Sequence, residues 1–259
     1  MASRKRIASC LVRQFPQYRS EAFIAGLRHH GYKVVESEWP NPEPGDVLVI
    51  WNRYRHLDAM AKRYESAGAT VLVAENGWIG TDRAGVQLYA IARSQHNGAG
   101  EWHVGAADRW SKLGIELAPW RGRGKHILVL PQRGIGPPGV GMPMSWAANV
   151  LSRLKEVTDR PIKVRVHPGR HRPPLEPDLE SCHAAVVWAS GAGIKAIVAG
   201  IPVFYEMDRW IGAPAAVHGI GDLEHPFLGD RFPMLNRMAW AQYTVTEIQS
   251  GAPFEWLLK

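Results

Sequence analysis

The sequence predicts an α/β fold made of two Rossmann-like halves, and three observations support this prediction. Short apolar runs rich in β-forming residues alternate with segments of helical periodicity along most of the chain. The apolar runs are nearly continuous, as in parallel strands that are buried on both faces. The 259 residues are enough for two domains of about 100 to 150 residues each, and the Gly-, Pro- and Arg-rich stretch APWRGRGK divides the alternation into two parts.

The first half follows the order strand, helix, strand, strand, helix, strand. We assign these elements, in turn, to residues 6–12, 21–31, 33–37, 46–52, 56–69 and 70–77. The short, β-rich strands in this list predict a parallel sheet with helices on both faces. We expect this half to span residues 1–122.

The second half resumes the alternation after the Gly/Pro/Arg-rich stretch. Its strand-like and helix-like segments follow one another at residues 126–134, 144–159, 161–169, 175–182, 183–190, 191–200 and 201–206. We expect a second domain at residues 123–238. The chain then ends in a stretch of helical spacing, and we predict a final helix over residues 239–259.

Composition indicates a soluble globular protein. Hydrophobic residues make up 46% of the chain and charged residues 21%. The longest apolar run is shorter than the roughly 20 residues of a membrane span, so no membrane partner is expected. The basic start MASRKRIASCLVRQF lacks the long apolar core of a secretory signal. Cys10 and Cys182 lack metal-ligand spacing and are predicted to be buried thiols in a reducing compartment, which favours the cytoplasm.

The charge balance favours anionic partners. The net charge is +7 and the isoelectric point is near 9.6, which suits nucleic acid or the phosphates of a nucleotide. The alternative is that the basic residues only solvate the surface. The sequence has no G-x-S-x-G elbow, H-E-x-x-H pair, clustered Cys/His set or kinase signature, so these chemistries are not indicated.

A serine- and glycine-rich turn follows one predicted strand of the second half. In VVWASGAGIKAIVAG the strand stops at Ala189, and Ser190, Gly191 and Gly193 open a helix. Ligands of open α/β sheets bind beyond the carboxyl ends of the strands, and small residues let a phosphate approach the unpaired helix N–H groups. We therefore predict phosphate binding here. The alternative is an ordinary N-capped turn.

A second turn of this kind is RVHPGRHR. Arg165 and His167 share one side of the preceding strand, because side chains alternate along a strand. His167 is suited to bond a ribose or a phosphate, while Arg165, Arg170 and Arg172 offer positive charge. A lone histidine before proline would more often be only a turn residue.

A third turn, LVLPQRGIGPPG, follows the first strand of the second half. Gln132, Arg133 and Gly134 offer a guanidinium and backbone donors to an anion. The spacing is neither that of a P-loop nor that of the Rossmann fingerprint. The alternative is a Pro/Gly-rich loop without a ligand.

The first half offers a candidate base and a candidate stacking surface. Glu75 ends the strand in VLVAENGWIG and is placed to act as a general base, although a glutamate before an Asn-Gly turn is commonly only solvated. The segment WNRYRH at another strand end offers the rings and charges of Trp51, Arg53 and Arg55 for binding a second substrate. Weaker competitors for the base are Asp46, Asp82, Asp108 and Asp208.

Together these residues resemble the GT-B class of nucleotide-sugar glycosyltransferases. The resemblance is best over residues 125–210 and rests on the His167-Pro168 turn and on SGAGIKAIVAGIPVF. The two turns are similar to the His-Pro and serine-turn pairs of bacterial sialyl- and Kdo-type transferases. The pattern ENG, HNG, PWR and PQRGIG is also similar to phage-encoded proteins of glycosyltransferase type.

The resemblance implies a cleft between two Rossmann-like halves, with the donor nucleotide on the second half and the acceptor on the first. It implies that His167 contacts the donor ribose or phosphate, and that Ser190, Gly191 and Gly193 hold phosphate oxygens. The final helix would cross back to the first half. Two departures are the single serine, where some relatives have a pair, and the lack of an E-x(7)-E motif.

The resemblance also implies a mechanism. Arg133 would offset leaving-group charge, and Gln132, Gly134 and Arg165 would also bind the donor nucleotide. Glu75 would deprotonate the acceptor hydroxyl. The nucleotide sugar would be a co-substrate, with no metal and no other cofactor. Preorganised donors around the departing phosphate would lower the barrier.

The expected acceptor is a hydroxymethylated pyrimidine in DNA, in keeping with the net charge and the phage-like pattern, and the setting would then be the host cytoplasm. The alternatives are a saccharide or lipid-linked acceptor, or a nucleotide- or DNA-binding module without turnover. The sequence predicts no oligomeric state.

Overall fold

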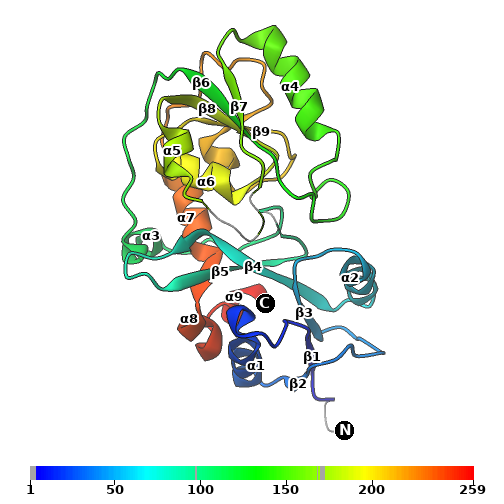
Figure 1. The fold of residues 1–259 in the computed structure, drawn as a ribbon. Coiled ribbons are helices and arrows are strands. Elements are labelled where there is room, and N and C mark those ends of the chain that lie inside the picture. The colour runs from blue at the N-terminus through cyan, green and yellow to red at the C-terminus, as the bar shows by residue number, and fades with distance from the viewer. Residues whose placement is uncertain (1–3, 97, 168, 170–172) are drawn as a thin grey trace. The chain divides into compact units, whose positions relative to one another are not determined.

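The computed structural model describes residues 4–96, 98–167, 169 and 173–259. The chain clusters into two compact units, each a β-sheet covered by helices (Figure 1). The first unit comprises Met1–His96, Gly100–Ala106 and Ala239–Lys259, and the second comprises Asn97–Ala99 and Ala107–Met238. Residues 107–122 therefore cluster with the second unit. The sequence predicts them in the first domain, with the boundary between the two domains near residue 122.

The first unit is built on a six-stranded sheet of order β11-β5-β4-β3-β1-β2. Its strands are β1 (Ile7–Cys10), β2 (Lys33–Val35), β3 (Val47–Trp51), β4 (Thr70–Thr81), β5 (Gln87–Arg93) and β11 (Gln242–Thr244). The first four strands pair in parallel, but β5 is antiparallel to both β4 and β11. The fully parallel sheet expected here is therefore wrong, because a hairpin and a strand from the far end of the chain complete it.

Strand β4 is longer than predicted. The sequence Asn76-Gly77 suggested a turn, yet the strand continues to Thr81 with an irregularity in its pairing to β5. Gly77 is needed for close packing: a Cβ there would lie 2.7 Å from the Leu88 carbonyl oxygen and 2.9 Å from Oε1 of Gln242. The glycine thus allows a close backbone approach inside the sheet.

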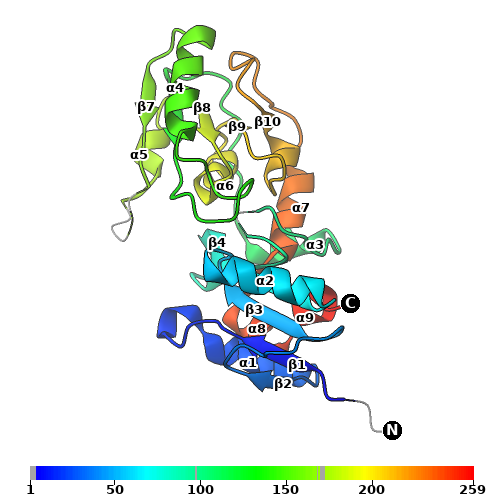
Figure 2. The same ribbon diagram turned by 90° about the vertical axis from the view of Figure 1, so that its right-hand side faces the viewer.

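Helices cover both faces of this sheet (Figure 2). Helix α2 (His56–Ser66) packs Ala61 and Tyr64 against one face. The other face is covered by α1 (Ser20–His29), α8 (Val245–Ser250) and α9 (Phe254–Leu257), and a short 3-10 helix, η1 (Pro16–Tyr18), precedes α1. Apolar side chains at the spacing of one helix face make each of these contacts favourable.

The C-terminal stretch is not one helix. It forms α7 (Phe232–Trp240), then β11, α8 and α9. Tyr243 is 2% exposed and lies opposite Tyr89 in the sheet, and a capping box between Thr244 and Glu247 starts α8. The prediction of a single helix over 239–259 is therefore wrong, because burial of Tyr243 in the sheet overrides the helical spacing.

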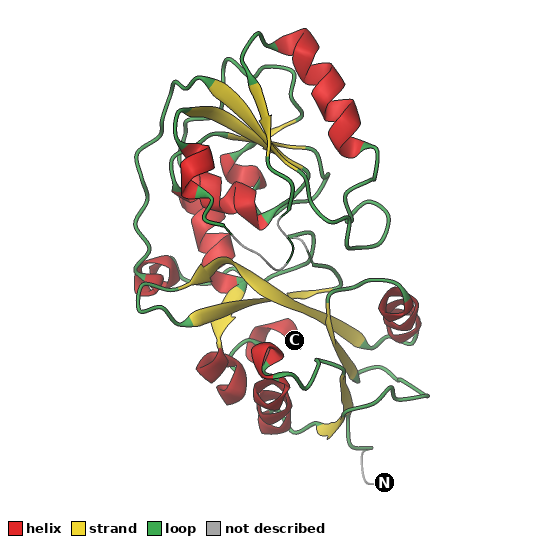
Figure 3. Cartoon of the chain, viewed as in Figure 1, coloured by secondary structure: helices red, strands yellow, loops and turns green. Residues whose placement is uncertain are grey.

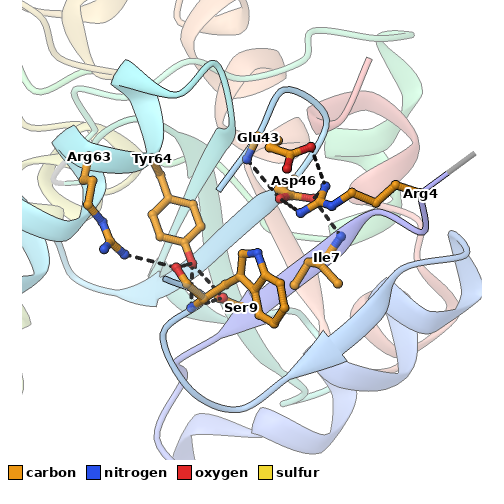
Figure 4. A network of polar contacts seen from close by, with 8 residues as sticks. Arg4, Ile7, Ser9, Glu43, Asp46, Arg63 and Tyr64 are labelled. Atoms are coloured by element: carbon orange, nitrogen blue, oxygen red, sulfur yellow. Dashed lines mark hydrogen bonds and ion pairs between the residues drawn. The ribbon is translucent and has the colours of Figure 1, made fainter. Parts of the chain in front are cut away.

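Two polar networks hold the segments around β1 and β3 of this unit (Figure 4). Asp46 is fully buried and accepts hydrogen bonds from both Arg4 terminal nitrogens, at 3.1 and 2.9 Å, and from the backbone N–H groups of Ile7 and Glu43, at 2.8 and 3.0 Å. Burial opposes ionisation of this carboxyl, but these hydrogen bonds outweigh it and lower its pKa. Asp46 is therefore a structural anion, not a candidate base.

The second network joins α2 to β1. The Ser9 and Tyr64 hydroxyl oxygens lie 2.7 Å apart, and both accept from the backbone N–H of Trp39, at 3.1 and 3.0 Å. These bonds satisfy two buried hydroxyls and hold the loop that leads from β2 to β3.

The second unit is a five-stranded parallel sheet of order β10-β9-β8-β6-β7 (Figures 1 and 3). Its strands are β6 (His126–Leu130), β7 (Ile162–Val164), β8 (Cys182–Val187), β9 (Val203–Tyr205) and β10 (Val217–His218). Its other elements are α3 (Asp108–Leu113), α4 (Trp146–Val157), α5 (Glu176–Leu179), α6 (Gly191–Val198), η2 (Ala213–Ala215) and most of α7. The parallel alternation predicted for this half is confirmed.

The Gly/Pro/Arg-rich stretch at residues 118–125 forms backbone hydrogen bonds to the second unit. The backbone N–H groups of Ala118, Arg121 and Lys125 donate to Val198, Gly200 and Ser181, at 3.0, 2.8 and 2.6 Å. Only glycine fits at position 200, because a Cβ there would lie 2.0 Å from the Pro119 carbonyl oxygen. Among the described residues, no helix is both long and apolar enough to cross a membrane.

Candidate functional site

The strand order of the second unit creates a switch point at its carboxyl edge. From β6, the first strand of this unit, the chain goes first to β7 on one side and then to β8 on the other. Connections that leave in opposite directions open a crevice between β6 and β8, which is where ligands of open α/β sheets bind. The turns after β6 and β8 meet there because the two strands are parallel neighbours.

The side chain of Gln132 joins these two turns. Oε1 of Gln132, two residues after β6, accepts from the backbone N–H of Ala189, two residues after β8, at 3.0 Å. The backbone N–H of Gln132 donates to the Met142 sulfur at 3.1 Å. Since its oxygen is taken by a backbone donor, the Gln132 amide presents Nε2, a donor, to the remaining space. The structure thus brings together Gln132 and the serine turn.

The loop after β6 is folded onto itself. Gly134 has φ +64°, and a Cβ there would lie 2.9 Å from the Met142 carbonyl oxygen, so only glycine fits without strain. The Trp188 indole N–H donates to the Val140 carbonyl at 3.0 Å and secures the end of the loop. Arg133 is exposed on this loop, and among the described residues no carboxylate pairs with it.

Ser190 is the N-cap of α6. Its hydroxyl accepts from the backbone N–H of Gly193 at 3.3 Å, and the residue is 8% exposed. The N-cap alternative is thus correct for its side chain. The backbone N–H groups of Gly191 and Ala192, in the first turn, have no partner within the described part of the chain, as expected at a helix start. Together with the helix dipole they favour an anion at this point.

Gly193 has a packing role. A Cβ there would lie 3.1 and 3.2 Å from the Trp210 ring and 3.2 Å from Val187. Its N–H is already bonded to Ser190, so the role of Gly193 in holding a phosphate oxygen stays a prediction that the structure does not support. Trp210 is 3% exposed and its ring centre lies 5.1 Å from that of Tyr205.

Sequence reasoning missed Trp210, whose ring packs against Gly193 in the first turn of α6. The signal was present, since Trp210 follows the last residue of β9 by five positions in FYEMDRWIG, at the same carboxyl edge. Large aromatics are more often core residues, which is why the pattern alone did not single it out.

The turn after β7 is only partly as predicted. The Arg165 guanidinium is bonded to Asp178 and to the carbonyl oxygens of Pro173 and Pro174, at 2.6 and 3.1 Å for the two carbonyls. It therefore neutralises a carboxylate of its own unit, and its predicted role in donor binding finds no support in the structure. Pro168, Arg170 and Arg172 lie outside the described residues.

His167 is exposed after β7, and its ring orientation is defined. Nδ1 accepts from the backbone N–H of Gly169 at 3.1 Å. The neutral ring must then carry its proton on Nε2, which makes that nitrogen a hydrogen-bond donor suited to an oxygen acceptor.

The candidates of the first unit fall into two groups. Trp51 is 9% exposed and packs edge-on against Tyr18 and Tyr89, with ring centres 4.7 and 6.1 Å away. Arg53 is 3% exposed and binds Asp58 and Glu65, at 2.7 and 2.6 Å, and the Ser94 carbonyl. Both residues are thus part of the core, and their predicted role in acceptor binding is wrong.

Two candidates of the first unit remain accessible. Arg55 is exposed, with its guanidinium 5.0 Å from the Tyr54 ring centre, and it holds φ 54°, a value that favours glycine. Glu75 is half-buried in the middle of β4, opposite Ala90, and not at a strand end as predicted. Of the weaker candidates for the base, Asp82 lies in a turn and Asp108 forms an ion pair with Lys112. Asp208 lies on an exposed loop.

Two solved structures share this fold over nearly the whole chain. KpsC of Thermosulfurimonas dismutans, a beta Kdo 2,7 transferase, matches with a TM-score of 0.57 and 15% identity, covering 97% of this chain and 98% of its own. Its beta Kdo 2,4 transferase matches with a TM-score of 0.56 and 12% identity, covering 93% and 92%. No protein-family model and no curated protein matches the sequence. The chain thus has a GT-B-like α/β fold with two Rossmann-like units.

Proposed function

We propose that the chain is a glycosyltransferase that moves a sugar from a nucleotide-sugar donor to a hydroxyl of a saccharide acceptor. The observation that carries this proposal is the Gln132–Ala189 bond of 3.0 Å, which joins two turns at the switch point beside the start of α6. The likeness in fold to two Kdo transferases agrees with it.

The donor phosphate is assigned to the carboxyl edge of the second unit. The groups proposed to contact it are the backbone N–H groups of Gly191 and Ala192, Nε2 of Gln132, the Arg133 guanidinium and Nε2–H of His167. All are donors, and negative charge develops on the departing phosphate as the glycosidic bond breaks. Gly134 and Ser190 shape this site through the loop turn and the helix cap.

The acceptor is proposed to bind the first unit, with Glu75 as the base that takes the hydroxyl proton and Arg55 as a contact. The likeness to Kdo transferases favours a saccharide over the DNA acceptor that the net charge suggested. The charge distribution supports the same choice, because the first unit contains 14 basic and 12 acidic residues, whereas the second contains 17 and 12. The proposed acceptor half is thus close to neutral.

The first experiment is a thermal-shift panel of nucleotides and nucleotide sugars. A ligand at 100 times its dissociation constant stabilises the folded state by roughly 2.7 kcal/mol. Donors that bind are then incubated with saccharide acceptors, with and without EDTA, and nucleotide release is measured. We expect acceptor-dependent release that persists in EDTA and is lost in Glu75→Gln. Absence of any stabilising nucleotide would contradict the proposal.

A further inference from the structure

The first unit contains a pocket at the edge opposite to the carboxyl ends of its parallel strands. Arg6 directly precedes β1 and Tyr32 directly precedes β2, so the pocket lies where these strands begin. Its other wall comes from the C-terminal segment, through Phe254, Leu258 and Lys259. Its volume is about 210 Å³. This is below the roughly 300 to 1,000 Å³ of sites for drug-sized ligands, so it suits a smaller molecule.

Arg6 is oriented as an anion-binding group. Its guanidinium carbon lies 4.6 Å from the centre of the Tyr32 ring, and one terminal nitrogen donates to the His30 carbonyl at 3.3 Å. Stacking uses the face of the guanidinium and leaves its in-plane N–H groups for other partners. Among the described residues no carboxylate pairs with Arg6. A planar carboxylate is the group that fits such a fork best.

The rest of the lining defines the body and charge of the ligand. Tyr32 and Phe254 are buried, and with Leu258 they supply an apolar wall. Lys259 also lines the pocket, with its ammonium 4.4 Å from the Trp256 ring centre, and Glu255 is the acidic residue of the lining. One guanidinium fork pairs with one planar carboxylate, which matches a monoanion better than a dianion.

We infer that this pocket binds a small organic monocarboxylate with an apolar or aromatic body. The carboxylate pairs with Arg6, and the body packs against Phe254 and Leu258. This site is separate from the proposed donor site and does not depend on the proposed function.

Occupancy of the pocket would link two distant parts of the chain. Arg6 and Tyr32 directly precede the N-terminal strands β1 and β2, and the opposite wall belongs to the segment that begins at Ala239. The His30 ring already bonds the Gly251 carbonyl at 2.9 Å across this junction. A bound carboxylate adds contacts to both sides, so it strengthens the attachment of the C-terminal segment to the sheet.

The test uses the full chain with benzoate as probe, and with benzamide and inorganic phosphate as comparators. Calorimetry should show benzoate binding, with affinity roughly tenfold lower for benzamide, because a charge-assisted hydrogen bond contributes about 1.5 to 3 kcal/mol. Hydrogen exchange should slow at residues 251–258 when benzoate is present. Arg6→Gln should weaken benzoate binding roughly tenfold. The control Arg28→Gln, at an exposed arginine at the end of α1, should not.

Three results would overturn the inference: no saturable benzoate binding, equal affinity for benzamide, or equal affinity in the Arg6→Gln and Arg28→Gln variants. Phosphate binding as tightly as benzoate would also overturn it, because the pocket would then select charge alone. Nucleotide stabilisation of the same samples is measured in parallel, so that failure here is distinguished from failure of the proposed glycosyltransferase activity.

Discussion

At the scale of single residues, Gln132 has two roles that a mutation can distinguish: one atom of its side chain supports the site, and another is proposed to contact the ligand. Its oxygen holds the Ala189 N–H, and its amide nitrogen is the proposed donor to the ligand. In Gln132→Glu a carboxylate oxygen still accepts from Ala189, but a negative charge replaces the donor. We therefore expect nearly unchanged thermal stability and at least roughly tenfold weaker binding of the stabilising nucleotide, measured by calorimetry.

Two further variants complete this test. Gln132→Met removes the bond between the turns and should lower both stability and nucleotide binding, because the Ala189 N–H loses its acceptor. Lys155→Gln, on the exposed face of α4, serves as the control and should leave both unchanged. Full nucleotide affinity in Gln132→Glu would restrict Gln132 to a structural role.

Asp46 leads to a prediction about pH. Its hydrogen bonds lower its pKa in the folded state, so its contribution is fully present above the ordinary value of about 3.9 and is lost as the pH falls through that value towards the folded-state pKa. Asp46→Asn loses the pairing with Arg4 and places an N–H₂ donor against a backbone donor. We expect roughly 1.5 to 3 kcal/mol lower unfolding free energy at pH 7, measured by urea denaturation.

The difference between the two proteins should shrink below about pH 3.9, since Asp46 then binds a proton in the unfolded wild-type chain while the folded state still resists protonation. Glu21→Gln, at a side chain that is 68% exposed, is the matched control and should change stability little at either pH. A constant gap from pH 7 to acid would show that Asp46 contributes through packing and not through its charge.

The cysteines give a chemical test of burial. Burial raises the pKa of the thiols of both Cys10 and Cys182 to about 12, so neither is a thiolate at neutral pH. We expect no reaction of the native protein with a thiol reagent at pH 8, and reaction of two thiols per chain after denaturation. Fast labelling of the native protein would show that one of these strands opens readily.

At the scale of the element, the start of α6 shows how packing and propensity compete. Replacing Gly193 by alanine gains up to about 1 kcal/mol of helix propensity but forces a methyl group against the Trp210 ring, and overpacking typically costs about 1 to 3 kcal/mol. We expect Gly193→Ala to destabilise by about 1 kcal/mol in urea denaturation. In a Trp210→Leu background the same change should stabilise, because the obstructing ring is gone.

Lys195→Ala, at an exposed position of the same helix, is the control and should be nearly neutral. If Gly193→Ala destabilises equally with and without Trp210, the two residues are not coupled and glycine is needed for another reason. A stabilising effect in the wild-type background would mean that the ring shifts at no cost.

The elements also show which parts of the fold could be predicted from sequence. The parallel strands β1, β3, β6 and β8 were predictable because burial on both faces makes each run almost entirely apolar. Strand β11 was not, because Tyr243 sits within helical spacing and finds its strand partner Tyr89 far away in the sequence. Gly77 has the sequence signature of a turn and instead permits a close approach of two strands. Long-range contacts decided both cases.

The site followed the same rule. The turns after β6 and β8 were predictable, because parallel strands bring their carboxyl ends to one edge. The partners of Arg53 and Arg165 were not, since a sequence does not show that Glu65 or Asp178 will take a guanidinium away from a ligand. An arginine at a strand end therefore indicates a ligand site only when no nearby carboxylate of the same unit pairs with it.

At the scale of the whole molecule, the unequal charge of the two units predicts how it discriminates between acceptors. The second unit holds most of the excess positive charge, as 17 basic against 12 acidic residues, and the first is close to neutral. Electrostatic binding to duplex DNA is non-specific, with dissociation constants of roughly 10⁻⁴ to 10⁻⁶ M, and weakens steeply with salt. We expect DNA affinity in this range at most, with no preference for a modified base.

The measurement is fluorescence anisotropy of a labelled duplex, with and without hydroxymethylated pyrimidines, between 50 and 200 mM salt. If the second unit holds most of the duplex, replacing the exposed Arg55, Lys62 and Arg63 of the first unit by glutamine should change this affinity little. Turnover of the nucleotide sugar should depend on the saccharide and not on the duplex. Tight, salt-resistant binding that requires the modified base, together with sugar transfer to it, would reverse the choice of acceptor, because a specific complex adds contacts that non-specific charge does not supply.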